Sequence, residues 1–579
     1  MSQELNGAQA LVRVLLGEAV RHVYGIVGGK LSPLLHAISR YPQLRFIGTR
    51  HEGAGPMMAA ASFAGTGQLA VAIAEMGPGG LNMISGLGVA FNNNLPVLAI
   101  TTNQHRAAAY PHSGMFMDLD TVAVSRPVVK WNAVVHDARR MPEIARRAIR
   151  EALSGRPGPV HLDIPQDVLG QVCHFPDDEF DLVPQRYRPV GRVRPDARAV
   201  LDAATLLAKA HRPLIVAGGG VVASDAAGQV RELARRLNCP VIPTQMALGV
   251  VPSDSAHFIG HGGLIAGAPI KEAFADADVI LSVGCRWSSW MWDENGPLAR
   301  RSHKIIAINL DPSALGHPAV HQVAMQADAR AALDELLDAT ANGWRSGVEA
   351  GWLPRLKASR ARYDEGFAAS TATPAPGMHP AALAREIARA LPHDALVVYD
   401  GGHTSFWSND LTPVQEVRTR FHEPGMSHLG FGLPYALALK AEWPERLVVL
   451  VTGDGSFGFT MNELDTARRY GLPVLTVIHN NEAWGIIRAG QKNALDFELG
   501  TSLGGTDYAA IAKGFGCHGE RVDKAQEVGP AIDRAIASGL PAVLDCRTHF
   551  VPHPAMPMFG SMNRYGFAAL DPSTSESHH

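Results

Sequence analysis

Two short polar motifs in the last third of the chain each follow an apolar segment. Residues 447–451 are apolar and precede a Gly-Asp-Gly-Ser motif at 453–456, and apolar residues 472–478 precede Asn480 and Asn481. Parallel strands joined by a helix end at the same edge of a sheet, so the carboxylate of Asp454 and the amide oxygen of Asn481 are expected to converge. Such oxygen ligands suit Mg²⁺ or Ca²⁺, and Mg²⁺ is usually held by few protein ligands together with phosphate oxygens. Either motif alone would be a tight turn or an asparagine cap, whereas together they predict a metal–diphosphate site.

Length and composition indicate a globular protein with several domains. At 579 residues the chain has room for about three to four domains of roughly 150 residues each. Its 46% hydrophobic and 18% charged residues are ordinary, and a net charge of −3 without a basic run argues against nucleic acid and charged membrane surfaces as partners. Five scattered cysteines lack CxxC spacing, which argues against disulfides and a zinc site. Because neither a signal-peptide pattern nor a membrane-length apolar stretch is present, the sequence predicts a cytoplasmic protein with no membrane attachment.

Strand-like and helix-like segments alternate along the chain, which predicts parallel sheets covered by helices on both faces. The first α/β domain is expected at residues 1–170, with a helical N-terminus, and residues 175–196 have the composition of a linker. A second α/β domain is expected at 195–340 and a third at 378–548, with another linker at 341–376. The tail at 549–579 is rich in Pro, Met, Gly and aromatic residues, which favours an ordered lid, although residues 573–579 have the composition of a disordered end.

Glu52 is a candidate catalytic residue in the first domain. It stands at the start of a helical segment that follows a strand. Alone, a glutamate there would be interpreted as a surface residue that stabilises the helix dipole. On a chain that also carries the Gly-Asp-Gly and Asn-Asn motifs, the segment RHEGAGPMMAA around Glu52 resembles thiamine-diphosphate (ThDP) enzymes of the acetolactate synthase-like family. That family includes acetolactate synthase, benzaldehyde lyase and 2-hydroxyacyl-CoA lyase, and the resemblance extends to about residue 550.

The resemblance implies a fold of three doubly wound parallel-sheet α/β domains, named Pyr, central and PP in chain order. It also implies active sites between the Pyr domain of one subunit and the PP domain of another, so a homodimer is the smallest active unit and a homotetramer is expected. In such enzymes the cofactor loses the proton on C2 of its thiazolium ring. A carboxylate that is hydrogen-bonded to N1′ of the aminopyrimidine makes N4′ the base, and Glu52 is expected in this role.

The resemblance assigns further cofactor contacts to individual residues. Mg²⁺ would be held by Asp454, Asn481 and the backbone carbonyl of Ala483. Leu429 would be the apolar wedge that bends the cofactor, and the Ser427 carbonyl would accept the N4′ amine. A loop at 400–404 resembles a second diphosphate contact, although its histidine and threonine could equally be solvated residues. The expected cofactor-binding residues are Glu52, Gly402, His403, Thr404, Ser427, Leu429, Gly453, Asp454, Gly455, Ser456 and Asn481.

The residues expected around the substrate depart from those of familiar relatives. Lys30, which follows Gly29, either holds a substrate carboxylate or phosphate or is a surface lysine. Met76 stands where relatives carry Ser, Thr or His, and Phe116-Met117 stand where they carry Phe-Gln or Tyr-Glu. Relatives thus have polar side chains at two places where this chain has thioethers and a ring. This substitution pattern predicts an apolar pocket that fits an alkyl or aryl carbonyl compound better than a second small keto acid.

Two residues after the Asn-Asn pair complete the expected pocket. Glu482 would face the thiazolium ring and shuttle a proton, and an apolar pocket would raise its pKa; the alternative is an exposed acid at a helix N-terminus. Trp484 is either a pocket wall or a core residue. In the central domain, residues 284–290 lack the RFDD-type segment of FAD-binding acetolactate synthases, which argues against FAD. The comparable segment of 2-hydroxyacyl-CoA lyases also carries a tryptophan, and this resemblance favours ADP or CoA in the central domain. Residues 561–565 of the tail could cover an acyl-CoA or form a structural strap.

The main hypothesis is therefore a ThDP- and Mg²⁺-dependent carbon–carbon lyase or ligase that cleaves or forms 2-hydroxyacyl compounds, either a 2-hydroxyacyl-CoA or an acyloin. The alternative is a 2-keto acid decarboxylase and carboligase of the acetolactate synthase type, for which Lys30 is the best support. A non-catalytic homologue is the third hypothesis. The intact Glu52, Asp454 and Asn481 argue against it, because a scaffold needs none of them.

Overall fold

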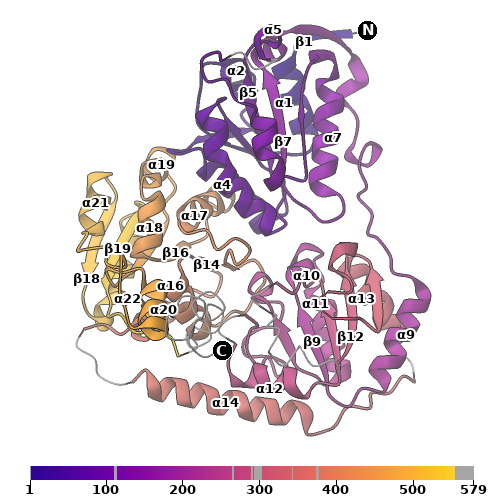
Figure 1. Cartoon of the computed structure of the whole chain (residues 1–579), viewed down its shortest axis with the longest axis vertical. Helices are drawn as coiled ribbons and strands as arrows, with labels where there is room; N and C mark the ends of the chain where they lie inside the picture. Colours follow the sequence, from indigo (N-terminus) through magenta and orange to yellow (C-terminus); the bar gives the residue numbers. More distant parts are fainter. Residues whose placement is uncertain are drawn as a thin grey trace, which may run out of the picture.

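The computed structural model describes residues 2–109, 114–263, 266–288, 291, 303–317, 319–341, 343–372 and 377–554, apart from the side chains of 493–495. Three α/β units follow one another along the chain, coloured indigo to purple, magenta, and orange to yellow in Figure 1. The long helix α14 (Trp352–Ser370) runs beneath the second and third units and connects them. The expected α/β fold with three parallel-sheet domains is confirmed.

The first unit is built on a six-stranded parallel sheet with the order β3-β2-β4-β5-β7-β6. Its central strands are apolar and buried because helices cover both faces. The strands are β2 (His22–Gly25), β3 (Arg45–Gly48), β4 (Val71–Ala74), β5 (Leu98–Asn103), β6 (Trp131–Val134) and β7 (Val160–Pro165). The main helices are α1 (Gly7–Gly17), α2 (Ser32–Ser39), α3 (Ala54–Thr66), α4 (Pro78–Asn92) and α7 (Met141–Leu153).

The third unit repeats the strand order of the first. Its sheet has the order β15-β14-β16-β17-β19-β18, so the strands of both sheets, counted along the chain, lie in the order 2-1-3-4-6-5. The strands are β14 (Leu396–Tyr399), β15 (Arg420–Phe421), β16 (Val448–Gly453), β17 (Leu475–Asn480), β18 (His518–Val522) and β19 (Ala542–Arg547). The helices are α15 (Pro380–Ala390), α16 (Gly402–Leu411), α17 (Gly432–Glu442), α18 (Asp454–Thr460), α19 (Glu463–Tyr470), α20 (Gly485–Leu495), α21 (Tyr508–Gly514) and α22 (Ala525–Ala537).

The central unit has a five-stranded parallel sheet with the order β10-β9-β11-β12-β13. The strands are β9 (Pro213–Ala217), β10 (Val241–Pro243), β11 (Val279–Val283), β12 (Lys304–Asn309) and β13 (Val323–Gln326). Helices α9 (Ala197–Ala208), α11 (Ala227–Leu237), α12 (Ala268–Asp276) and α13 (Ala329–Ala339) accompany it. Domain limits of 1–170, 195–340 and 378–548 remain predictions, and all three sheets fall within them.

Helices α3 and α17 join the first and third units. Helix α3 is rich in Ala and Gly, and α17 is apolar on nearly every side. Both are almost entirely buried, as expected of helices with no solvent face. Their residues belong to one hydrophobic core that draws on both sheets. The two helices approach closely at Gly65, where a Cβ atom would lie 2.6 Å from Cδ2 of Leu439. The two units are therefore packed through a shared core.

The N-terminus differs from its expected helical form. Residues Ser2–Asn6 form strand β1, which pairs antiparallel with β8 (Val172–Pro176), at the start of the segment expected to be a linker. The Asn6 side chain accepts the Gln9 N–H while the Gln9 side chain accepts the Asn6 N–H, and this capping box begins α1 at Gly7. Because the box stops the helix, the preceding residues are available for strand pairing.

Two further features of the chain agree with the composition. All five cysteines are free and buried. Among the helices of the described residues, none has the length and apolar character that a bilayer span requires. Of the expected lid at 549–579, residues 549–554 are described, and residues 555–579, including 561–565, lie outside the described residues, as do Ser289 and Trp290.

Candidate active site

The Gly-Asp-Gly and Asn-Asn motifs meet at the carboxyl edge of the third sheet. Strands β16 and β17 are parallel neighbours, with Gly453 opposite His479, so Asp454 and Asn481 follow adjacent strand ends. The N–H of Ala483 donates to Oδ2 of Asp454 at 3.2 Å and to Oδ1 of Asn481 at 3.1 Å. Both side-chain oxygens thus face one point, which is the arrangement that a shared Mg²⁺ needs. Two hard oxygen donors and a nearby carbonyl are a donor set that fits this ion.

Glycines let the chain pack closely beside these oxygens. A Cβ atom on Gly455 would lie 2.5 Å from the Trp484 ring, and one on Gly402 would lie 1.9 Å from Cδ1 of Ile486. The loop before α16 approaches the Gly-Asp-Gly-Ser motif, because a Cβ on Gly453 would lie 3.3 Å from Oγ1 of Thr404. Helices α16 and α18 begin here, at Gly402 and Asp454. The N–H groups of a first helical turn suit phosphate oxygens, so this edge fits the diphosphate of ThDP.

His403 is buried at this edge and is held by the C-terminal segment. Its Nε2 accepts the backbone N–H of His553 at 3.3 Å. Burial, with a smaller contribution from the charge of His553, lowers the pKa of His403 to about 4. The imidazole is therefore neutral at physiological pH, and it would contact a diphosphate as a hydrogen-bond donor through Nδ1 rather than as a cation.

Two buried carboxylates hold the loop that contains Ser427 and Leu429. Asp400 accepts the N–H groups of Gly430 and Gly432, both at 3.0 Å, and burial raises the pKa of its carboxyl to about 7. Glu423 accepts the N–H groups of Met426 at 2.6 Å and His428 at 2.8 Å, and the side-chain amide of Asn93 at 2.5 Å. These bonds flank Ser427, whose φ of 55° lies in the left-handed region. Neither acid was singled out from the sequence.

Replacing Glu423 with alanine should destabilise this loop and the protein. The Met426 and His428 amides and the Asn93 side chain would lose their acceptor, and we expect a loss of about 2–4 kcal/mol since each unpaired buried group costs about 1–3 kcal/mol. For a domain of this size that corresponds to a fall of roughly 5–10 °C in Tm, measured by calorimetry. Glu423→Gln keeps an acceptor and should lose less than half as much. Equal losses for the two variants would contradict the assigned role.

Glu52 lies at the carboxyl edge of the first sheet, in the turn between β3 and α3. Its Oε2 accepts the side-chain amide of Asn82 from α4 at 2.9 Å. A Cβ atom on Gly79, in the first turn of α4, would lie 3.5 Å from Oε1 of Glu52. The glutamate is half-buried, and Asn82 orients its carboxylate. Asn82 was missed from the sequence because it is 30 residues away and follows no motif.

Glu75 brings together three loops that were expected to line the substrate. Its carboxylate accepts the N–H of Lys30 at 2.8 Å and the N–H of Met76 at 3.2 Å, and it is hydrogen-bonded to Oγ1 of Thr102. A Cβ atom on Gly77 would lie 2.8 Å from the carbonyl oxygen of Met117, so that segment lies against the same turn. Residues Gly29, Lys30, Met76, Phe116 and Met117 therefore gather at one edge of the first sheet.

The expected apolar pocket is wrong in part. Met76 is only 1% exposed and belongs to the core, whereas the neighbouring Glu75 places a carboxylate among the loops. Phe116 is 78% exposed, and its carbonyl accepts the Gln104 side chain at 2.6 Å. Comparison with relatives had singled out Met76 and not the acid beside it. The edge offers apolar and charged groups together.

Glu482 is not in the apolar surroundings that were expected. Its carboxylate forms an ion pair with Nη1 of Arg547 at 2.6 Å, and its side chain is 49% exposed. Its φ of 54° is in the left-handed region, which turns the chain sharply between Asn481 and Ala483. Arg547 is 65 residues away in sequence and ends β19, so the pairing depends on the order of strands in the sheet. The charge of Glu482 is compensated by a partner that sequence reasoning did not find.

Trp484 packs within the third unit. Its ring meets Phe459 edge-on at 6.1 Å between centroids and lies over Gly455. In the described part of the chain, no hydrogen bond or ion pair connects Trp484 or Glu482 with the loops of Lys30, Met76 and Phe116. The candidate residues of the described chain therefore fall into two clusters, one around Glu52 and one around Asp454, which are named half-sites below.

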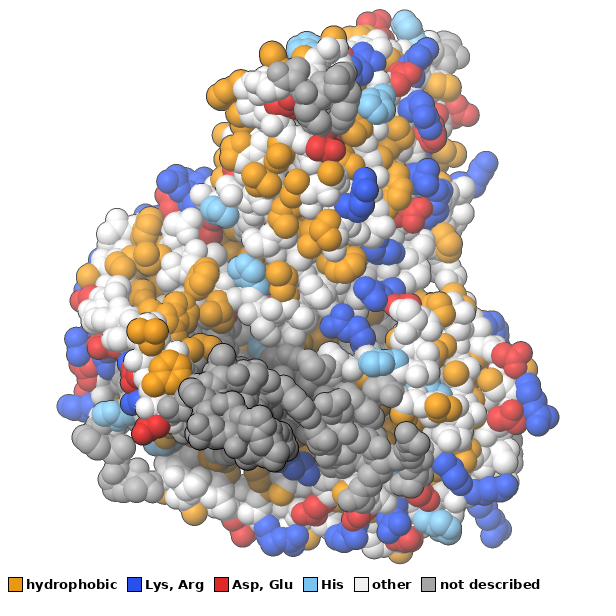
Figure 2. Space-filling view, viewed as in Figure 1, with side chains coloured by type: hydrophobic (Ala, Val, Ile, Leu, Met, Phe, Trp, Pro, Cys, Tyr) orange, Lys and Arg blue, Asp and Glu red, His pale blue; other side chains and the backbone are white. Residues whose placement is uncertain are grey.

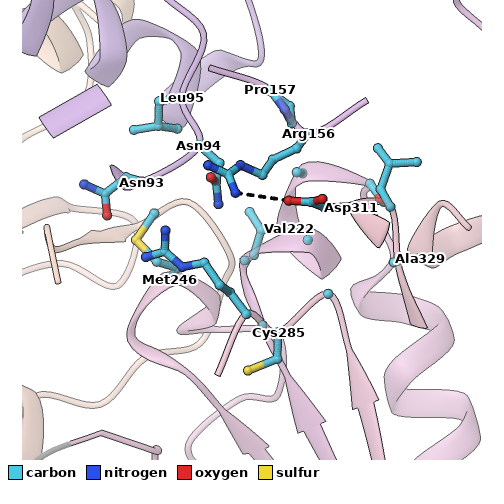
Figure 3. Close-up of a pocket in the computed structure, with 18 of the residues that line it drawn as sticks. Asn93, Asn94, Leu95, Arg156, Pro157, Val222, Met246, Cys285, Asp311 and Ala329 are labelled. Carbon is cyan, nitrogen blue, oxygen red and sulfur yellow. Dashed lines mark hydrogen bonds and ion pairs between the residues drawn. The ribbon is translucent and has the colours of Figure 1, made fainter. Parts of the chain in front are cut away.

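A cavity of about 870 Å³ lies elsewhere, between the central unit and its two neighbours. Figure 3 shows Met246 and Cys285 of the central unit on one side and Asn93 and Asn94 of the first unit on the other. Arg156 of the first unit forms an ion pair with Asp311 at 3.0 Å across it (Figure 3). Among the described residues, several that line this cavity carry a buried polar atom without a partner, among them Nε1 of Trp287, Oε1 of Gln245 and Oδ1 of Asn94.

Comparisons with known proteins match the whole of this architecture. The N-terminal TPP binding domain of thiamine pyrophosphate enzymes matches residues 5–124, their central domain matches 200–336, and their C-terminal TPP binding domain matches 400–546. The acetolactate synthase large subunit of Corynebacterium glutamicum is 30% identical over 545 residues, which cover 92% of this chain and 85% of that protein. The acetolactate synthase large subunit of Parasynechococcus marenigrum is 30% identical over 560 residues (94% and 87%), and the probable one of Methanococcus aeolicus is 28% identical over 570 residues (93% and 92%).

Proposed function

The chain belongs to the thiamine pyrophosphate enzymes, and from this premise we propose that it is a Mg²⁺-dependent decarboxylase and carboligase that acts on a 2-keto acid. The main support is the similarity to relatives named acetolactate synthase, which extends over 92–94% of this chain. This similarity favours the reaction over cleavage of 2-hydroxyacyl compounds. The enzyme would release CO₂ from the keto acid and join the remaining acyl unit to a second carbonyl compound.

The residues of both half-sites have defined tasks in this proposal. When bound, ThDP would supply the chemistry of the reaction, a carbon nucleophile and an electron sink. Glu52, oriented by Asn82, would hold the N1′ position of the aminopyrimidine and so make the amino group basic. Asp454, Asn481 and the Ala483 carbonyl would hold Mg²⁺ against the diphosphate. Asp400 and Glu423 would keep Ser427 and Leu429 in place against the ring system.

Lys30 is the proposed anchor of the keto-acid carboxylate. Its backbone N–H is fixed by Glu75, whereas its ammonium group forms no ion pair with the carboxylates of the described residues. A fixed backbone with an uncommitted cation suits a small anionic substrate. Glu482 is already paired with Arg547 and would serve as a proton carrier only when that pair opens.

A substrate panel tests the proposed reaction. The Mg²⁺–ThDP-loaded enzyme should release CO₂ from short 2-keto acids, and Lys30→Met should raise KM by about 10- to 100-fold, the usual effect of one charged hydrogen bond of 1.5–3 kcal/mol. Lys30→Arg, which keeps the cation, should retain most of the affinity. Aldehyde release from 2-hydroxyacyl-CoAs without CO₂ release from any keto acid would contradict the proposal.

The lyase reaction remains the second candidate because of one observation. Phe116 is largely exposed beside Met117 at the edge of the first sheet, and both would suit a larger alkyl or aryl group. The same panel separates the two reactions, since the lyase releases an aldehyde and needs no carboxylate on its substrate.

A homodimer is proposed as the smallest active unit, with a homotetramer as the full assembly. Figure 2 shows hydrophobic side chains gathered on one face, over both the first and the third unit. Exposed apolar residues lie near both half-sites: Val27, Leu81 and Phe116 in the first unit, and Phe459 and Ile487 in the third. A second copy that places its third unit against the first would cover them and complete each site. Sedimentation velocity should show no monomer at micromolar concentration.

The cavity of the central unit is proposed to hold a nucleotide such as ADP or the nucleotide part of CoA. Its cationic lining and its unpaired Trp287, Gln245 and Asn94 atoms suit a phosphorylated, hydrogen-bonding ligand, and the lining arginines are Arg156, Arg188, Arg192, Arg286, Arg418 and Arg420. Calorimetric titration with ADP and with CoA tests this, with Arg156→Gln as the weakened variant. An enzyme purified with a flavin absorption band would contradict the expectation that FAD is not the ligand.

A further inference from the structure

Helix α19 of the third unit is hydrogen-bonded to the loop that leads to Glu52 in the first unit of the same chain. Tyr470 Oη accepts the N–H of Gly48 at 2.8 Å, and Nη2 of Arg469 donates to the Gly48 carbonyl at 2.8 Å. At the other end of the helix, Oε1 of Glu463 accepts the N–H of Arg50 at 2.9 Å and the N–H of His51 at 3.1 Å. The backbone from the end of β3 to the residue before Glu52 is thus bound along the length of one helix.

Glu463 is the buried member of this set. Its relative exposure is 0%, and its second oxygen accepts the hydroxyl of Thr466 at 2.6 Å. Burial of an acid is costly unless its oxygens are fully hydrogen-bonded, and here the bonds come from two backbone amides of another domain. Burial raises the pKa of Glu463 to about 7, and its hydrogen bonds oppose that rise. An acceptor oxygen, which both the charged and the neutral acid provide, is what these amides need.

We propose that Glu463 is a positioning residue for cofactor activation: by holding the Arg50 and His51 amides it fixes the direction in which Glu52 leaves the loop. The inference rests on the proposed role of Glu52. His51, whose amide is held, directly precedes the carboxylate-bearing Glu52, so a backbone shift there moves the carboxylate directly. A misplacement of about 1 Å at a catalytic group can cost about 100-fold in rate.

The same stretch also carries the metal half-site. Helix α18 begins at Asp454, and α19 follows it after two residues, so residues 454–470 connect the metal and diphosphate ligands with the Glu52 loop of the same subunit. A change in the position of α18 would therefore be passed to Glu52 through α19. A contact that served only to join the domains would not require bonds to the two residues directly before Glu52.

Three measurements on Glu463 variants test the inference, with full-length protein and without substrate. They are the affinity for Mg²⁺–ThDP by calorimetry, the rate at which C2 of bound ThDP exchanges its proton for deuterium, and amide exchange in a peptide that covers residues 48–53. Glu463→Met removes the acceptors at similar volume, and Glu463→Gln retains one. Glu527→Gln, an exposed acid on α22, is the matched control.

For Glu463→Met we expect amide protection at Arg50 and His51 to be lost and C2 exchange to slow by about 10- to 100-fold, with ThDP affinity changed less than about 3-fold. Glu463→Gln and the control should resemble the wild type in all three measurements. Unchanged C2 exchange despite lost amide protection would overturn the inference. So would a Gln variant as slow as the Met variant, because the charge and not the acceptor would then matter.

Tyr470→Phe is the second variant, which tests the same contact if Glu463→Met does not fold. It removes only the acceptor for Gly48, on the half-buried end of the helix. It should slow C2 exchange by about 2- to 5-fold at unchanged ThDP affinity, and an unchanged rate would contradict the inference. Since C2 exchange needs no substrate, the result stands whether the enzyme acts on a keto acid or on a 2-hydroxyacyl compound.

Discussion

Glu52→Gln should lower kcat by about 10²- to 10⁴-fold, the range that general acid–base catalysis contributes. The amide is isosteric and can still bond with Asn82, so the fold and the affinity for Mg²⁺–ThDP should stay close to those of the wild type. What the amide cannot do is accept and stabilise the proton shared with N1′ of the cofactor. Steady-state turnover, together with calorimetric ThDP binding, provides the check.

Asn82→Ala is expected to have a smaller effect on turnover than Glu52→Gln. It leaves the Glu52 carboxylate in place but removes the group that orients it, and we expect a loss of about 10-fold, comparable to the removal of one neutral hydrogen bond of about 1 kcal/mol or slightly more. Turnover that survives Glu52→Gln undiminished would show that Glu52 does not activate the cofactor.

Asp454→Ala should abolish binding of Mg²⁺ and, with it, of ThDP. Loss of an outer partner of a metal ligand typically costs about 10–100-fold in metal affinity, so loss of a direct carboxylate ligand should cost at least about 100-fold. The Ala483 N–H would retain Asn481 as an acceptor, so the turn itself should persist. Calorimetric titration with Mg²⁺ and ThDP measures the loss.

Asp533→Asn, an exposed acid on α22 of the same unit, is the matched control. It should bind Mg²⁺–ThDP like the wild type. An Asp454→Ala protein that still bound the cofactor with an affinity within a few-fold of the wild type, about 1 kcal/mol or less, would place the metal elsewhere.

The sequence was sufficient for the parts of the site that depend on strand order. Residues after two apolar runs converge whenever the runs become neighbouring parallel strands, and this is what happened to Asp454 and Asn481. The position of Glu52 in the turn before α3 followed in the same way from a strand followed by a helix. These inferences need only local periodicity and the rule that parallel strands share an edge.

Residues that act through backbone groups of distant loops could not be predicted. Glu75, Glu423 and Glu463 each accept N–H groups from loops whose sequence carries no record of the donor, and Glu463 lies more than 400 residues from its partners. The pattern of side chains shows which residues are apolar. Nearly every residue carries the same backbone N–H group, so the sequence does not show which N–H group a distant carboxylate binds. The ion pair of Arg547 with Glu482 and the pairing of the N-terminal strand with residues 172–176 also join distant parts of the sequence, and they could not be predicted either.

The most direct test of the central claim is complementation between Glu52→Gln and Asp454→Ala. The two chains would be co-expressed with different affinity tags, and the mixed dimer isolated. If each active site combines the first unit of one subunit with the third unit of the other, one of the two sites in the mixed dimer is intact and activity should return to about half of the wild-type value. A mixed dimer that stays as inactive as either parent would contradict a ThDP site assembled from the Glu52 and Asp454 half-sites of two subunits.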